Sequence, residues 1–323
     1  MEYFFSHART ALKYGLKALN LDAGDEILVP AYVCDVVIHP LNELGIKPVF
    51  YPVSGDLKPA WERLPELVTG KTKGVLAVHY FGQPQEIARF MEFCKLHGIL
   101  LIEDNAHGFG GSLQGKPLGT FGDIGISSPR KILGWRNGGI LHLNWEAAFP
   151  ELPLQPGKLR WKLRSALKRL ACSNGAICNS LRRMPDFHSQ DVGREQPIPS
   201  WKMDGEYGST LRNLDVLPLR EKRRQVWRVW KQWAEGNGLT PVYPELSPEA
   251  CPLEFPVHTR SAEESRNWFE WGWKRGLYVH SWPALPKQVI ESDNETMRLW
   301  ETLVCFPIMP EMDAGRLSKR LGI

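Results

Sequence analysis

The sequence is poor in cysteine and has no long hydrophobic run. Six cysteines are spread over 323 residues, at positions 34, 94, 172, 178, 251 and 305, without a C-x-x-C pair or a histidine at zinc-ligand spacing. This usage argues against a disulfide framework or a zinc site and indicates reduced thiols in the cytosol. Eighteen consecutive apolar residues occur nowhere, and the start, MEYFFSHART, lacks the features of a signal peptide. We therefore expect a cytoplasmic protein without a membrane span.

Acidic residues are absent from one long segment. Between Leu152 and Pro185 there is no Asp or Glu, but there are eight Lys or Arg residues. A solvated helix face is the simplest interpretation, and the pyrophosphate of a nucleotide sugar or an anionic membrane surface are alternatives. The whole chain carries a net charge of only +4 and no recognised nucleic-acid-binding motif, so we expect no nucleic-acid partner.

Short apolar segments alternate with helical patterns in the first half of the chain. The apolar segments are residues 26–29, 48–53, 74–80, 99–102 and 139–143, and helical patterns cover residues 10–21 and 85–97. This alternation predicts an α/β fold with a mainly parallel sheet and helices on both faces. We expect a large domain over residues 1–200 and a smaller α+β domain over residues 201–323. The second domain would contain a tryptophan-rich helix and a helix capped by Ser261 and Glu264.

Two segments place reactive side chains just after predicted strands, where ligands bind in parallel sheets. In LLIEDNAH an apolar strand delivers Asp104 and His107. In GTFGDIGISSPRK a short strand is followed by Ser128 and Lys131. A partly desolvated lysine can form an imine with an aldehyde, and the serine hydroxyl can donate to a phosphate. Taken singly, Asp104 could be a turn former and Lys131 a solvated surface charge.

A third segment, SHARTAL, begins a helix at residues 6–12. Its exposed backbone N–H groups, together with Arg9 and Thr10, form a plausible phosphate site. A helix cap beside a surface arginine is the simpler interpretation of this segment alone. The order of the three segments along the chain is more informative than any one of them.

In that order the chain resembles the DegT/StrS family of pyridoxal-phosphate-dependent sugar aminotransferases. The resemblance lies in ARTALKYGLKALNLDAGDEILVPAYVC, KGVLAVHYFGQPQEI, HGILLIEDNAHGFGG and GTFGDIGISSPRKILGWRNGGIL. It covers roughly residues 5 to 145 and is fainter in GLYVHSWPALP and LVCFPIMPEM near the C-terminus. It implies the fold type I architecture, with a large seven-stranded sheet domain and a small C-terminal domain. Such enzymes serve polysaccharide or secondary-metabolite biosynthesis.

The resemblance also implies roles for individual residues. Lys131 would hold pyridoxal 5'-phosphate as a Schiff base and move protons, and Asp104 would keep the pyridine nitrogen protonated. His107 would lie near the ring, and the phosphate would be held by Ser128, Arg9 and Thr10. Cys34 stands where some relatives have an aromatic residue that stacks on the ring.

The family resemblance further implies a homodimer whose active site is completed by the second subunit. Tyr207, Ser209 and Arg212 are candidates for reaching the neighbouring phosphate. Two departures concern the substrate: the compact Ser128–Lys131 spacing, and Asn137 where an acidic residue is common. The chain also begins close to the phosphate-site helix, whereas many relatives carry a preceding segment.

We therefore predict an aminotransferase that transfers an amino group, with glutamate as donor, to a nucleotide-linked keto-sugar. A dehydratase on the same scaffold is an alternative, but those relatives replace the lysine with histidine. A catalytically silent, cofactor-binding protein with a regulatory or scaffolding role is the other.

Overall fold

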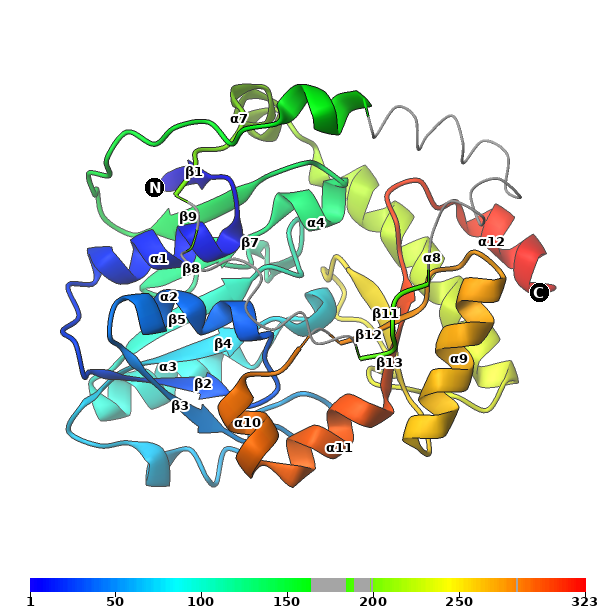
Figure 1. Cartoon of the computed structure of the whole chain (residues 1–323), viewed down its shortest axis with the longest axis horizontal. Coiled ribbons are helices and arrows are strands. Elements are labelled where there is room, and N and C mark those ends of the chain that lie inside the picture. Colours follow the sequence, from blue (N-terminus) through cyan, green and yellow to red (C-terminus); the bar gives the residue numbers. More distant parts are fainter. Residues whose placement is uncertain (164–183, 189–197, 199, 283) are drawn as a thin grey trace.

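The computed structural model describes residues 1–163, 184–188, 198, 200–282 and 284–323. Its larger half is built on a seven-stranded sheet with the order β1-β9-β8-β5-β4-β2-β3 (Figure 1). The strands in that order are β1 (Glu2–Phe5), β9 (Gly139–Leu143), β8 (Ile124–Ser127), β5 (Leu100–Asn105), β4 (Thr72–Val78), β2 (Glu26–Pro30) and β3 (Lys47–Tyr51). The run from β8 to β3 is parallel, and β9 is antiparallel to both of its neighbours. The predicted mainly parallel sheet is confirmed.

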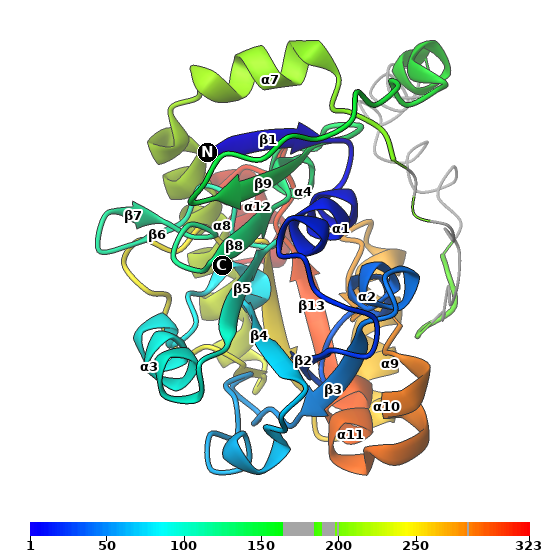
Figure 2. The ribbon, with the colours of Figure 1, turned by 90° about the vertical axis from the view of Figure 1, so that its left-hand side faces the viewer.

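Helices cover both faces of this sheet (Figure 2). The helices are α1 (Ala8–Ala18), α2 (His39–Glu43), α3 (Ile87–His97) and the short α4 (Pro129–Leu133). Side chains alternate along β2, so that Ile27 and Val29 pack with α1 and α2 while Leu28 packs with α3. All five residues of β2 are buried, which explains why its sequence is a continuous apolar run.

The C-terminal half forms a smaller antiparallel sheet with the order β10-β11-β13-β12. These strands are β10 (Thr240–Pro241), β11 (Glu254–His258), β13 (Leu303–Pro307) and β12 (His280–Ser281). The helices of this half are α7 (Gly205–Arg212), α8 (Val216–Gly236), α9 (Ala262–Lys274), α10 (Lys287–Ser292), α11 (Asn294–Thr302) and α12 (Ala314–Leu321), and a small hairpin, β6 (Ser112–Leu113) and β7 (Lys116–Pro117), belongs to the first half. The predicted small α+β unit is thereby confirmed.

Tryptophans of α8 form much of the hydrophobic core between this helix and the smaller sheet. Trp227, Trp230 and Trp233 are all buried and pack against Phe255 and Phe306 of the sheet. At the start of α9 the predicted cap is present, since the Ser261 hydroxyl accepts the N–H of Glu264 at 3.2 Å. These tryptophans are therefore structural.

The connection between the halves is attached to the large sheet before it reaches α8. The N–H of Ser6 donates to the carbonyl of Trp201 at 2.9 Å, and the N–H of Asp204 donates to the Asn137 side chain at 3.2 Å. The domain boundary at residues 200/201 stays a prediction. Most of the acid-free stretch, residues 164–183, lies outside the described residues, so the interpretations of that stretch stay predictions too.

Among the described residues, no helix is both long and apolar enough to cross a membrane. The four cysteines in the described part of the chain, Cys34, Cys94, Cys251 and Cys305, are free thiols.

A fully buried carboxylate fixes the loop that leads to the candidate site. Glu103 accepts the N–H groups of Gly119 at 2.6 Å and Phe121 at 2.7 Å, and it pairs with the His79 ring at 2.7 Å. Burial raises the pKa of this carboxyl, but the hydrogen bonds outweigh burial and the net shift is downward. The charged network holds residues 119–122 just before β8, which carries the chain to Lys131.

Replacing Glu103 by glutamine should destabilise the protein strongly. The amide cannot accept all of these hydrogen bonds, and His79 would lose its buried partner, so the free energy of unfolding should fall by about 3–5 kcal/mol. Urea denaturation monitored by circular dichroism measures this loss. The exposed Glu62→Gln provides the control and should change stability by less than about 0.5 kcal/mol. Equal effects of the two substitutions would contradict this role for Glu103.

Candidate active site

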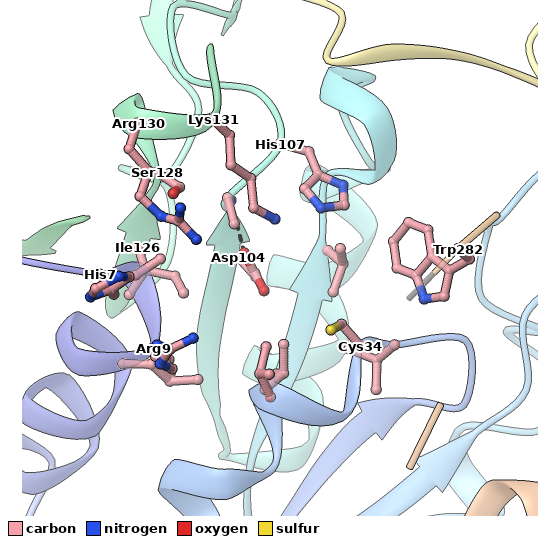
Figure 3. A pocket seen from close by; sticks show the side chains of 17 residues that line it. His7, Arg9, Cys34, Asp104, His107, Ile126, Ser128, Arg130, Lys131 and Trp282 are labelled. Carbon is pink, nitrogen blue, oxygen red and sulfur yellow. Dashed lines mark hydrogen bonds between the residues drawn. The ribbon is translucent and has the colours of Figure 1, made fainter. Parts of the chain in front are cut away.

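A pocket opens at the carboxyl ends of the parallel strands, beside the start of α1 (Figure 3). This is where ligands bind in open α/β sheets. Side chains from α1, from the loop after β2, and from the ends of β4, β5 and β8 line it, and one residue comes from the small domain. The lining residues with polar or aromatic side chains are His7, Arg9, Cys34, Asp104, His107, Ser128, Arg130, Lys131 and Trp282.

Lys131 lies in α4, and its amine points into the pocket (Figure 3). Its side chain is accessible from the pocket, but protein surrounds the pocket itself, and burial lowers the pKa of the amine. The charge of Arg130 lowers that pKa further, whereas Asp104 and Glu254 act in the opposite direction. A lysine in these surroundings can become neutral and attack a carbonyl carbon.

Asp104 lies one residue before the end of β5 and faces the same pocket as Lys131 (Figure 3). Only 4% of its surface is exposed, and its Oδ1 accepts the N–H of Ala106 at 2.8 Å. Burial raises the pKa of this carboxyl, while the Ala106 hydrogen bond and the charge of Lys131 oppose the rise. The carboxylate therefore gains from any cationic group that enters the pocket.

His107 lies three residues after Asp104, and its ring packs against Phe81 and Trp282. Its Nδ1 accepts the N–H of Phe81 at 3.3 Å, which assigns the ring proton to Nε2. Burial and the charge of Lys131 hold the pKa of His107 well below its usual range. The ring is thus a neutral hydrogen-bond donor in the pocket wall.

Positive charge gathers at the end of the pocket beside α1. Arg9 and Arg130 both line this end, and burial together with the charge of Arg130 lowers the pKa of Arg9 (Figure 3). Burial and these arginines lower the pKa of His7 to about 3, so that its ring is neutral. Within the described ranges, no carboxylate forms an ion pair with Arg130, and the buried Ser128 hydroxyl adjoins it. A dianion such as a phosphate would relieve this excess positive charge.

Sequence reasoning missed Arg130 and His7 as members of this cationic end. Arg130 directly precedes Lys131, and His7 directly precedes α1. Two other residues singled out in the sequence lie elsewhere. Thr10 is fully buried within α1 and does not line the pocket, and Asn137 is buried in hydrogen bonds to Gln155 and Asp204.

Cys34 and Trp282 form the side of the pocket away from the arginines (Figure 3). The Cys34 thiol lies 3.7 Å from Asp35 Oδ1, and burial raises its pKa to about 11, so the thiol is neutral. Trp282 packs on Tyr32, with ring centroids 4.8 Å apart, and comes from the chain just after β12. An aromatic wall is therefore present, but it comes from a different part of the sequence than expected.

Comparisons with known proteins agree with this architecture. Residues 5–149 match the model of the DegT/DnrJ/EryC1/StrS aminotransferase family. Over this segment the chain is similar to that family. All the pocket residues named above except Trp282 fall within the matched segment.

Individual relatives match only part of their own length. GDP-perosamine synthase of Vibrio cholerae is 36% identical over 124 residues, which are 38% of this chain and 34% of that protein. The dTDP-4-dehydro-2,3,6-trideoxy-D-glucose 4-aminotransferase of Saccharopolyspora spinosa is 30% identical over 194 residues, or 59% of this chain and 48% of that protein. The matched segments thus span from about a third to about half of these relatives.

The similarity in fold to solved structures extends over nearly the whole chain. The aminotransferase TlmJ from Streptoalloteichus hindustanus superposes with a TM-score of 0.72 at 20% identity, covering 99% of this chain and 84% of that one. Helicobacter pylori PseC, an aminotransferase, superposes with a TM-score of 0.71 at 16% identity, with coverage of 99% and 85%. The predicted family architecture, including the small C-terminal domain, is confirmed.

Proposed function

We propose that this chain is a pyridoxal-phosphate-dependent aminotransferase that transfers an amino group from glutamate to a nucleotide-linked keto-sugar. The observation that carries the proposal is the convergence of Lys131, Asp104 and the cationic end in one pocket. The match of residues 5–149 to the family model supports it, as do the relatives named for nucleotide-linked sugars. A protein from Streptococcus pneumoniae named as a sugar aminotransferase shares the fold, with a TM-score of 0.72 at 18% identity, and was solved in its PLP form.

The pocket residues fit pyridoxal phosphate in order along the pocket. Arg9, Arg130 and Ser128 suit its phosphate, Asp104 suits the protonated ring nitrogen, and Lys131 suits the aldehyde. When bound, the cofactor supplies a ring that accepts electrons from the substrate carbon. The proposed phosphate site differs from the predicted one in using Arg130, and Thr10 has no part in it.

The protein's own groups then have distinct tasks. Lys131 can take a proton from the substrate carbon and return it, because burial lowers the pKa of its amine and so makes the neutral form more accessible. Asp104 supplies a fixed negative charge. His107 donates from Nε2 and cannot compete for the proton, since its pKa is far below the usual range.

The proposal includes a cytoplasmic homodimer. Ser209 and Arg212 of α7 are exposed, and Tyr207 stacks on Trp135 with ring centroids 4.4 Å apart. These exposed side chains remain our candidates for reaching the phosphate site of a partner subunit. Cross-linking after Arg212→Cys substitution would test that reach.

The visible spectrum of the purified protein tests the proposed function. With pyridoxal phosphate added, we expect an imine absorbance band that bleaches on addition of glutamate. Mass spectrometry should then detect amination of UDP-N-acetyl-3-dehydro-glucosamine or of dTDP-4-dehydro-2,3,6-trideoxyglucose, the acceptors named for two relatives. A band that ignores glutamate would instead indicate another donor or a catalytically silent relative. Absence of any band would contradict the proposal.

Replacing Arg130 by glutamine should weaken cofactor binding. Removing a charge-assisted contact to phosphate costs about 1.5–3 kcal/mol, which corresponds to about 10–100-fold in Kd. Equilibrium titration with pyridoxal phosphate, read by absorbance, measures this without any turnover. The exposed Arg63→Gln is the matched control and should bind the cofactor like the wild type. Equal Kd values for both variants would remove Arg130 from the phosphate site.

A further inference from the structure

Three neighbouring strands of the small sheet bring a carboxylate, an imidazole and a thiol together outside the pocket described above. Glu254 lies on β11, His280 on β12 and Cys305 on β13, and His280 is the direct cross-strand partner of Cys305. One side-chain ligand atom from each lies within 4.8 Å of the others. No part of the proposed chemistry uses this cluster.

Hydrogen bonds fix the cluster so that its carboxylate remains charged. Glu254 Oε1 lies 2.7 Å from His280 Nε2, and His280 Nδ1 lies 3.3 Å from the carbonyl oxygen of Tyr278. Both ring nitrogens therefore have acceptors, which is the pattern of an imidazolium cation. Burial alone would raise the pKa of Glu254, but His280 and Cys305 lower it. The second carboxylate oxygen of Glu254 retains acceptor capacity for a ligand.

The cluster lies on the face of the small sheet that is turned toward the large domain, near the pocket that holds Lys131, although none of its three side chains lines that pocket. Strand β13 turns Cys305 toward the core of the large domain, whereas Val304 and Phe306 enter the core of the small one. His280 and Trp282 are two residues apart, and Trp282 lines the pocket of Lys131. The side chains of His280 and Glu254 keep exposed fractions of 39% and 18%, so the cluster is open to a ligand. The charges of Glu254 and Lys131 also interact.

The Glu254 cluster favours ligand groups of the opposite kind to those favoured by the cationic end. Arg9 and Arg130 suit a phosphate, whereas the Glu254 carboxylate would repel one. A charged carboxylate with remaining acceptor capacity instead accepts hydrogen bonds from hydroxyl or amino groups. The charges of Glu254 and Lys131 interact, so a group bound at Glu254 would lie on the Lys131 side of the small sheet.

Building on the proposed function, we infer that Glu254 binds a ring hydroxyl of the sugar acceptor beside the carbon that is aminated. His280 is a positioning residue, because it holds the carboxylate in place and in its charged form. The ligand class is therefore a hydroxylated keto-sugar, bound at this end of the cavity while the cofactor phosphate lies at the other.

The two acceptors named above separate this inference from a general effect on Lys131. UDP-N-acetyl-3-dehydro-glucosamine carries a hydroxyl on C4, next to its keto carbon, whereas the 2,3,6-trideoxy sugar has no ring hydroxyl next to its keto carbon. For Glu254→Gln we expect KM for the hydroxylated acceptor to rise about 10–100-fold. We expect little change, below about threefold, in KM for the trideoxy acceptor. His280→Gln should shift KM in the same direction, and Glu254→Asp should restore part of the loss.

Controls make the outcomes distinct. Glu263→Gln, on the exposed face of α9, should match the wild type with both acceptors. Melting temperatures and the imine band show whether each variant is folded and loaded. Equal KM increases for both acceptors, or none, would overturn the inference while the proposed function stands. A wild-type protein that forms no imine band with pyridoxal phosphate would overturn the proposed function as well.

One further outcome concerns the thiol. Because the same three side chains could ligate a transition metal, the assays are repeated after dialysis against EDTA. Loss of acceptor binding in EDTA that Zn²⁺ restores would replace the direct hydrogen bond with a metal-mediated contact and overturn the inference. Unchanged binding in EDTA supports it.

Discussion

Lys131→Ala is expected to abolish the visible imine band and to reduce amine transfer by about 10⁴-fold. The pocket offers an amine whose pKa is lowered by burial, and alanine removes both the nucleophile and the proton carrier. Absorbance spectra of the wild type and the variant, each mixed with pyridoxal phosphate and then with glutamate, measure both effects. The cationic end is intact in the variant, so it should still bind the cofactor without forming the imine.

The exposed lysine at position 95 supplies the comparison, since Lys95→Ala removes an amine far from the pocket. That variant should keep the band and the full rate. If Lys131→Ala keeps the band, another lysine holds the cofactor and the assignment of the site is wrong.

Asp104→Asn is expected to leave the imine band in place but to slow the glutamate half-reaction by about 10²–10³-fold. Asparagine keeps the shape of the side chain and can still accept the N–H of Ala106, but it lacks the negative charge. The cofactor should therefore bind, whereas its ring should lose the charge that stabilises a protonated nitrogen. Single-turnover bleaching with glutamate separates these two steps.

Asp22→Asn, at an exposed site before β2, is the matched substitution and should behave like the wild type. A wild-type rate in Asp104→Asn would mean that the buried carboxylate has only a structural role. Failure of Asp104→Asn to bind the cofactor at all would show that the carboxylate is needed for binding before it is needed for chemistry.

Local patterns predicted most of the large domain. The buried run of β2 and the amphipathic spacing of Leu12 and Leu16 each follow from a few consecutive residues, and both are confirmed. By contrast, β1 was missed, because it is short and partly exposed and exists through pairing with β9 more than a hundred residues later. Pairing over such a distance leaves no periodic signal in the strand itself.

The same distinction applies to the site. Asp104, His107, Ser128 and Lys131 follow strands of a parallel sheet, so their convergence could be predicted from their positions in the sequence. Trp282 could not, because it enters the pocket from the small domain. The cluster around Glu254 was equally invisible, since strands β11, β12 and β13 are joined only by the fold.

Thr10 illustrates the limit of motif reasoning within a single helix. It adjoins Arg9, yet successive residues of a helix point about 100° apart, so Arg9 faces the pocket while Thr10 enters the core. Arg130 directly precedes Lys131 and lines the same pocket. A sequence pattern that identifies the imine lysine does not indicate that the arginine before it also faces the ligand.

Borohydride reduction of the holoprotein, followed by digestion and peptide mass spectrometry, locates the residue that holds the cofactor. Reduction converts the imine to a stable secondary amine on the lysine that formed it. We predict a single pyridoxyl-modified peptide with the modification on Lys131. Modification of a different lysine, or none in a protein that shows the imine band, would contradict the assignment of Lys131 and the active site built around it.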